Sequence, residues 1–241
     1  MPHLTTWQWT FGISAALMIG LGKTGAPGVA TLTVPLMVFA VGDAKHAAAW
    51  TAPILIVGDI FAVGYWRRRA EARALFSLIP WVAVGMIAGG LALSVSDHML
   101  RRVLGVVLLG MLALAVWRRS RPGEPLRGHP AFYGVAAGFA TTIANAAGPV
   151  MSSYLLTRRL PKEQFVATGA WFFLVVNVVK LPIYWANALF SPASFMFDLA
   201  MVPPAVCGAL FGLWLVSRVS QRSFDGLIIA LSAVSALFLF R

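Results

Sequence analysis

The stretch Gly20-Leu-Gly-Lys-Thr-Gly-Ala-Pro-Gly28 separates two apolar runs near the start of the chain, and Ala144-Asn-Ala-Ala-Gly-Pro-Val150 does the same in the second half. Glycine and proline are the poorest residues for the interior of a helix. We therefore expect one helix to break over Gly22–Gly28 and another over Asn145–Pro149. Each break is either a kink in one crossing helix or the tip of a hairpin that enters and leaves by the same face.

The composition around these breaks is that of a membrane protein. Of the 241 residues, 59% are hydrophobic and only 11% are charged, which is too few polar groups to cover a soluble domain. Runs such as Leu75–Val95, Val103–Trp117 and Leu199–Val216 approach the roughly 20 apolar residues that cross a bilayer. We expect an all-α integral membrane protein with a single membrane domain over residues 1–241.

Short separators divide the chain into ten apolar elements, expected at about 7–22, 26–41, 48–66, 75–95, 100–117, 131–144, 147–157, 164–187, 196–216 and 223–240. No Lys or Arg precedes the first of them within Met1–Thr10. A cleaved secretory signal needs a basic start, so we expect the first helix to be retained.

The two halves resemble each other. Besides the two glycine-rich breaks, the pattern Pro-x4-Gly-x3-Gly occurs at 80–89 and again at 203–212, and Asp59 falls opposite Asn177. The offsets of these three matches are 121, 123 and 118 residues. Three matches in the same order indicate an internal duplication, with one repeat over about 7–117, a connector over 118–130 and a second repeat over about 131–240.

The positive charges indicate how the elements cross the membrane. If each broken pair is a hairpin, thirteen Lys and Arg residues lie on one face and four on the other. Cytoplasmic loops are enriched in Lys and Arg, which also accounts for the net charge of +11 without a nucleic-acid partner. The N-terminus is then outside and the Arg-rich loops are cytoplasmic. Because each repeat has five elements, the repeats are inverted, each a broken, re-entrant hairpin followed by three transmembrane helices. The thirteen residues are Arg67, Arg68, Arg69, Arg73, Arg118, Arg119, Arg121, Arg127, Arg158, Arg159, Lys162, Arg218 and Arg222, and the four are Lys45, Arg101, Arg102 and Arg241.

Broken helices inside a membrane imply a cavity, because only protein or water can satisfy their free backbone groups. Helix N-termini there favour anions, and inverted repeats with such breaks are a common plan for secondary transporters. The expected anion-binding residues surround the two breaks: Lys23, Thr24, Gly25, Gly28, Asn145 and Gly148. Two alternatives stay open here, namely that Lys23 extends to the membrane surface and that Asn145 only bonds a neighbouring helix.

Three further polar residues in apolar stretches are expected to provide coupling or charge balance. Asp59 is either a proton carrier or half of a structural ion pair with Lys23 or Lys180. Lys180 either belongs to the site or extends to the nearby membrane surface. Asn177 either contacts a ligand or bonds between helices.

The sequence carries no pattern typical of an enzyme or of a metal or cofactor site. It contains no hydrolase triad, and Gly20-x-Gly22-x-x-Gly25 has no βαβ unit around it. The single cysteine, Cys207, and four histidines without ligand spacing predict no metal centre. We expect no catalytic residue, no cofactor and no metal.

The Gly20–Gly28 stretch followed by Pro35 resembles the first signature of the TauE/SafE sulfite exporter-like (TSUP) family. The second half agrees through Gly138 to Pro149, then Lys162-x4-Ala167-Thr168 before the helix with Asn177, and a terminal Pro-x4-Gly-x3-Gly. The resemblance covers nearly the whole chain. It implies an inverted-repeat transporter of sulfur-containing anions, such as sulfite or a sulfonate, in the cell inner (cytoplasmic) membrane.

These observations together predict a secondary transporter that moves a small anion by alternating access. The alternatives are an anion channel and a membrane enzyme or assembly factor that uses the cavity for a lipid-like substrate. The expected partners are the lipid bilayer and the small anion. Coupling to a proton or another ion, and assembly into a homodimer, are left open.

Overall fold

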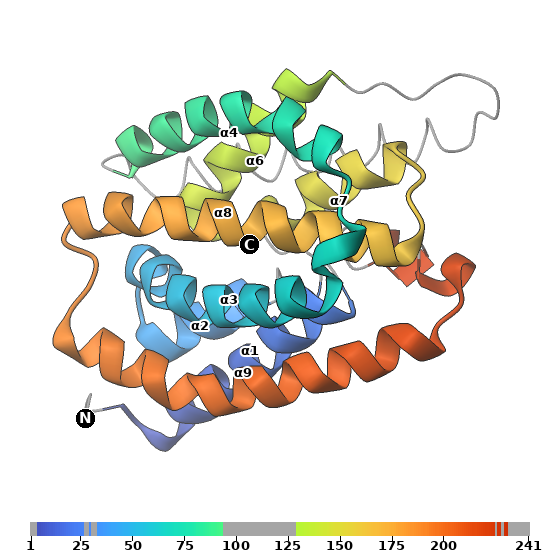
Figure 1. The fold of residues 1–241 in the computed structure, drawn as a ribbon. Helices are drawn as coiled ribbons and strands as arrows, with labels where there is room; N and C mark the ends of the chain where they lie inside the picture. Colours follow the sequence, from blue (N-terminus) through green and yellow to red (C-terminus); the bar gives the residue numbers. More distant parts are fainter. Residues whose placement is uncertain are drawn as a thin grey trace.

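The structure is a computed structural model that describes residues 4–26, 29, 33–93, 129–224, 226–227 and 229–230. Its described helices are shown in Figure 1. They are α1 (Thr6–Thr24), α2 (Thr33–Val41), α3 (Ala44–Trp66), the 3-10 turn η2 (Arg67–Arg69), α4 (Ala72–Ala92), α6 (Pro130–Ala144), α7 (Ala147–Thr157), α8 (Lys162–Ala186) and α9 (Pro192–Arg218). These helices lie within about four residues of the predicted elements, except that α2 begins at Thr33 where an element from residue 26 was expected. The predicted element 100–117 and most of 223–240 lie outside the described residues.

Within the described part of the chain, four helical segments are long and apolar enough to cross a membrane. They are Ala44–Arg69, Ala72–Ala92, Lys162–Ala186 and Pro192–Arg218. Large apolar side chains on these segments, such as Phe76, Leu91 and Leu199, are more than two-thirds exposed. A bilayer would cover such side chains, so the prediction of an all-helical membrane fold is confirmed at this level.

Both predicted breaks exist, but the neighbouring helices extend further into them than the sequence suggests. Helix α1 continues through Lys23 to Thr24 and is capped by Gly25, so the expectation that Gly22 already leaves the helix is wrong. Helix α7 begins at Ala147, which places Gly148 and Pro149 in its first turn. Proline is tolerated there because the first N–H groups of a helix have no partner within the helix.

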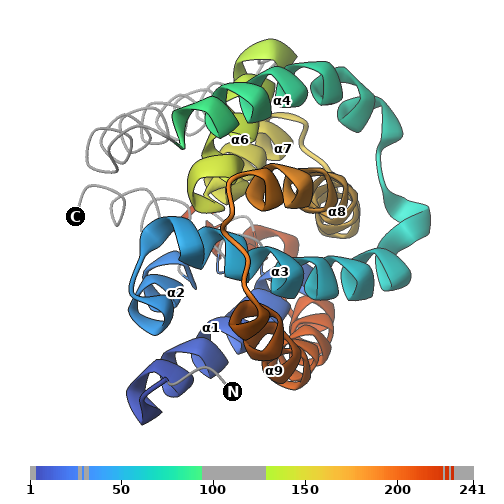
Figure 2. The same cartoon turned by 90° about the vertical axis from the view of Figure 1, so that its left-hand side faces the viewer.

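Two pairs of parallel helices hold the broken elements in place. Helix α1 lies along α9, and α6 lies along α4 (Figures 1 and 2). A Cβ atom on Gly12 would meet the Phe197 ring, and one on Gly25 would lie 2.0 Å from the carbonyl oxygen of Gly212. These contacts advance in the same direction along both helices, so α1 and α9 are parallel. Small residues permit this close approach of helices in membranes.

The α4–α6 pair is built in the same way. A Cβ on Gly138 would lie 2.2 Å from the carbonyl oxygen of Val82, and one on Gly89 would lie 2.9 Å from the Cβ of Thr142. Thr142 donates its hydroxyl to the carbonyl of Gly138 (2.9 Å). Thr24 donates its hydroxyl to the carbonyl of Gly20 in the same way (3.1 Å). The two helix pairs are therefore both parallel and both contain a threonine bonded to the glycine carbonyl four residues earlier.

Helices α3 and α8 lie between these two pairs and run antiparallel (Figure 2). Buried residues from the start of α3, Ala48 and Ala52, pack with Tyr184 from the end of α8. At the other end, the hydroxyl of Thr168 accepts a hydrogen bond from the Glu71 backbone N–H (2.9 Å). The centre of the bundle is therefore where the middles of α3 and α8 face each other.

A lysine at one end of the bundle bonds the C-terminal end of α9. Lys162, at the start of α8, donates its ammonium to the carbonyls of Val216 (3.0 Å) and Val219 (2.6 Å) at the end of α9. Cations are favourable there because the carbonyls at a helix C-terminus carry a negative partial charge. The contact also shows that α8 and α9 run in opposite directions.

Candidate functional site

Lys23 is held in the last turn of α1 by a buried carboxylate from α3. Its Nζ lies 2.8 Å from Oδ1 of Asp59, and both side chains are buried. The ammonium also lies 4.1 Å from the centre of the Phe173 ring on α8, a distance at which a cation is attracted to an aromatic face. Lys23 therefore points into the bundle, and the alternative that it extends to the membrane surface is excluded.

Asp59 is held from two sides. While its Oδ1 faces Lys23, its Oδ2 accepts a hydrogen bond of 2.5 Å from Nδ2 of Asn177 on α8. A buried carboxylate keeps its charge only where such partners replace water. The sequence alternatives that Asp59 forms an ion pair and that Asn177 bonds a neighbouring helix are both realised in this arrangement.

Lys180, one turn beyond Asn177 on α8, is fully buried. Its ammonium donates to Oγ1 of Thr141 (3.3 Å) and to Oδ1 of Asn145. A lysine that reached the membrane surface would be exposed at its tip, so that alternative is wrong for Lys180. Among the described residues, no carboxylate lies within 4.0 Å of its Nζ.

Asn145 forms the bend between α6 and α7. It has a left-handed backbone (φ 51°, ψ 26°), a conformation that asparagine tolerates better than most residues. Its side chain accepts from Lys180 and donates Nδ2 to the carbonyl of Ala48 on α3 (2.8 Å). The bend therefore connects the second broken element to the centre of the bundle.

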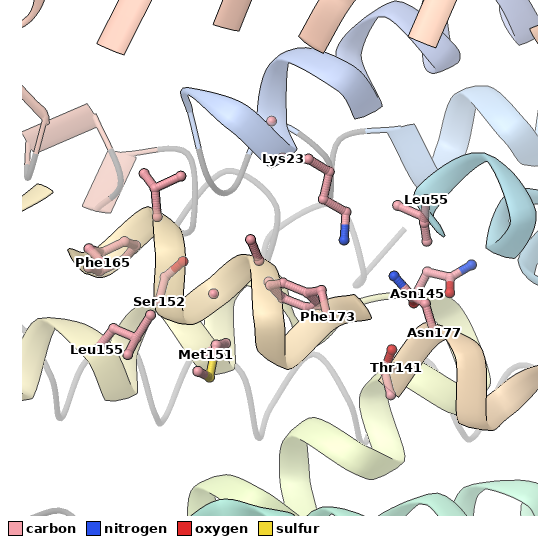
Figure 3. A pocket seen from close by; sticks show the side chains of 15 residues that line it. Lys23, Leu55, Thr141, Asn145, Met151, Ser152, Leu155, Phe165, Phe173 and Asn177 are labelled. Atoms are coloured by element: carbon pink, nitrogen blue, oxygen red, sulfur yellow. The ribbon is translucent and has the colours of Figure 1, made fainter. Parts of the chain in front are cut away.

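A cavity opens between these groups (Figure 3). Its volume is about 40 Å³, room for about three water molecules or one small ion. Lys23, Asn145, Asn177 and Thr141 lie toward one end, and Ser152, Leu155 and Phe165 toward the other. The full lining is Gly22, Lys23, Leu55, Thr141, Asn145, Gly148, Met151, Ser152, Leu155, Phe165, Val166, Gly169, Ala170, Phe173 and Asn177.

The remaining predicted site residues lie elsewhere. Thr24 donates its hydroxyl to the carbonyl of Ala209 on α9 (2.7 Å), and Gly25 packs against Gly212. Neither lines the cavity, so both act here in holding α1 to α9. Gly28 lies outside the described residues.

Several lining residues carry no signal that the sequence alone could have revealed, among them Phe173 and Ser152. Thr141 stands 118 residues after Lys23, the offset that relates Asp59 to Asn177. The offset of 121 at the glycine-rich breaks would instead pair Lys23 with Ala144, so the repeat alone does not identify Thr141. Among the described residues, no group of three or more His, Cys, Asp or Glu side chains could hold a metal ion.

The fold and the site together define a multi-pass helical membrane protein in which Lys23 lines an internal cavity and its buried ion-pair partner, Asp59, lies beside it. The chain belongs to the TauE/SafE family: the family model described as "Sulfite exporter TauE/SafE" matches residues 12–239. Its description names a sulfite exporter, and the family indicates a membrane transporter of sulfur-containing anions. Searches of curated proteins and of solved structures return no match.

Proposed function

We propose that the protein is a secondary transporter that carries a small, sulfur-containing anion through the cavity at the centre of the bundle. The observation that carries this proposal is the charge around the cavity. Lys23 and Lys180 are positive and Asp59 is negative, which leaves one positive charge buried among them. An unmatched buried charge is costly, and an anion in the adjacent cavity would match it.

The cavity wall offers suitable contacts for such an anion. Gly148 lies in the first turn of α7, where backbone N–H groups have no helical partner and the helix dipole is positive. The Asn145 side chain lies beside it at the bend. Leu55, Met151 and Phe173 provide apolar wall, which suits an anion with a compact apolar part, such as a short sulfonate.

We further propose that the two halves are inverted repeats and that transport proceeds by alternating access. Support comes from helix directions. Helix α1 is parallel to α9, and α6 is parallel to α4, while α3 is antiparallel to α8 and α8 to α9. Since α4 runs back in the direction opposite to α3 after the short η2 connection (Figure 1), α1 and α6 run in opposite directions. The proposed bounds are about 7–117 and about 131–240 for the repeats, with a connector over 118–130.

Uptake into proteoliposomes tests the function directly. The purified full-length protein is expected to catalyse saturable uptake of sulfite or methanesulfonate above that of empty liposomes, and no uptake of the neutral analogue dimethyl sulfone. Flux that rises linearly with substrate concentration would indicate a channel instead of a transporter. Absence of uptake for every sulfur-containing anion would contradict the proposal.

Filling the cavity is expected to stop this transport. Gly169 lies in the lining, and among the described residues a Cβ there would meet Cδ1 of Leu155 alone, at 3.9 Å, so Gly169→Leu should fold with its side chain in the cavity. The leucine would occupy the space that the anion needs, so we expect uptake to fall by about tenfold or more, which corresponds to about 1.4 kcal/mol of binding free energy. The matched control is Gly64→Leu on α3, where a Cβ would meet no described atom within 4 Å. Equal uptake by both variants would remove this cavity from the transport path.

The proposed topology places the N-terminus outside and η2 at the cytoplasmic face of the inner membrane. In a Cys207→Ser background the chain has no other cysteine, so single cysteines can be placed at will. We expect Asn187→Cys to react with an impermeant maleimide in intact spheroplasts and Arg68→Cys to react only after permeabilisation. The reverse labelling pattern would invert the topology.

A further inference from the structure

We propose that Lys180, and not Lys23, supplies the positive charge that the transported anion neutralises, and that the site therefore selects monoanions. This inference rests on the proposed transport function and assigns its charge recognition. Among the described residues around the cavity, it divides three buried charged side chains into a neutral pair, Lys23 with Asp59, and one unpaired cation, Lys180. A bound monoanion then brings the cluster to zero, whereas a dianion leaves one negative charge buried.

Both oxygens of the Asp59 carboxylate already have partners, one of which is Lys23. One oxygen lies 2.8 Å from the Lys23 ammonium, and the other accepts from Asn177. The Phe173 ring covers the ammonium from the α8 side. Lys23 lines the cavity with a charge that is already balanced.

Lys180 has only neutral acceptors. Its ammonium bonds the Thr141 hydroxyl and the Asn145 amide oxygen, and its own helix places the Tyr184 ring 5.8 Å away. The charged groups that act on it from neighbouring helices are Lys23 on α1 and Asp59 on α3. Among the described residues, these contacts leave the Lys180 charge unpaired.

The two acceptors of Lys180 connect it to the cavity. Thr141 and Asn145 both belong to the lining and lie at the end where Asn177 also faces the space (Figure 3). An anion against Asn145 would be one side chain away from the Lys180 ammonium. At this separation in a poorly polarisable surrounding, charge attraction remains strong, so the Lys180 charge acts on the anion. The hydrogen bonds to Thr141 and Asn145 hold the Lys180 ammonium in position.

A single substitution of Lys23 cannot test this division, because it also frees Asp59. In Lys23→Met the Asp59 carboxylate would be left to balance Lys180. The cluster would then be neutral, with no net positive charge to attract the anion. Adding Asp59→Asn removes that carboxylate charge and restores one net positive charge. The informative comparison is therefore between Lys23→Met, the double variant Lys23→Met with Asp59→Asn, and Lys180→Met.

The experiment measures the affinity of the detergent-purified full chain for methanesulfonate by titration calorimetry, with sulfate as the dianion and dimethyl sulfone as the neutral control. Wild type should bind methanesulfonate and neither control. Because each of these variants leaves the cluster without the net positive charge that balances the anion, Lys180→Met and Lys23→Met should each weaken binding about tenfold or more. The double variant should recover to within about threefold of wild type, or roughly 0.65 kcal/mol.

Two outcomes would overturn the inference. One is a double variant that stays weak while Lys180→Met binds normally, which would make Lys23 the anion's partner. The other is a wild type that prefers sulfate. Wild-type protein that binds no anion would instead reject the proposed function itself, and that result is separate from any difference among variants. Gel-filtration profiles verify folding, and Lys180→Gln, which keeps a donor, replaces Lys180→Met if the latter does not fold.

Discussion

Gly20→Leu is expected to prevent the chain from folding. A Cβ on Gly20 would lie 1.9 Å from the carbonyl oxygen of Ala205 and 2.5 Å from the backbone nitrogen of Ala209. These are backbone atoms of α9, which cannot move aside as a flexible side chain could. Overpacking against yielding neighbours costs roughly 1–3 kcal/mol, and here α1 would have to separate from α9. The measurement is the yield of monodisperse protein by fluorescence-detected gel filtration.

Two other substitutions show whether this effect belongs to the helix contact. Gly138→Leu meets the equivalent obstacle on α4, with a Cβ 2.2 Å from the carbonyl oxygen of Val82, and should fail in the same way. Gly64→Leu, whose Cβ meets no described atom within 4 Å, should be produced like wild type. Normal yield of Gly20→Leu would show that α1 and α9 do not approach as closely as described.

The helices were predictable because membrane helices are long apolar segments. The breaks were predictable because they are rich in glycine and proline. The edges of the breaks were not predictable. Helix propensity disfavours Gly22, but the close packing of α1 on α9 carries the helix on to Thr24. Tertiary contact of this kind commonly overrides propensity, and a sequence does not reveal which neighbour will provide it.

The candidate site shows the same limit at the level of side chains. Lys23, Asp59 and Lys180 stand out in the sequence as charges in apolar stretches, and all three meet at the centre. Which lysine takes the carboxylate depends on how α1, α3 and α8 rotate about their axes. The sequence does not determine these rotations, so only the assembled structure distinguishes the paired lysine, Lys23, from Lys180.

Asp59→Asn is expected to destabilise the protein strongly. The new side chain keeps the shape of Asp59, and its oxygen can still accept from Asn177. Its amide nitrogen then faces the Lys23 ammonium, so two donors oppose each other and the Lys23 charge loses its counter-charge. Removing one partner of a buried ion pair costs about 3–5 kcal/mol. The measurement is the thermal unfolding midpoint in detergent without added anion.

Lys23→Met in the Asp59→Asn background should recover most of this loss. Methionine fills the apolar part of the Lys23 site beside Phe173 without a charge, and replacing both members of a buried pair is often nearly neutral where removing one is not. The excess of the single loss over the double loss measures how tightly the pair is coupled. If the two variants were equally unstable, the Lys23–Asp59 contact would not hold α1 to α3, and Asp59 would instead balance both lysines together.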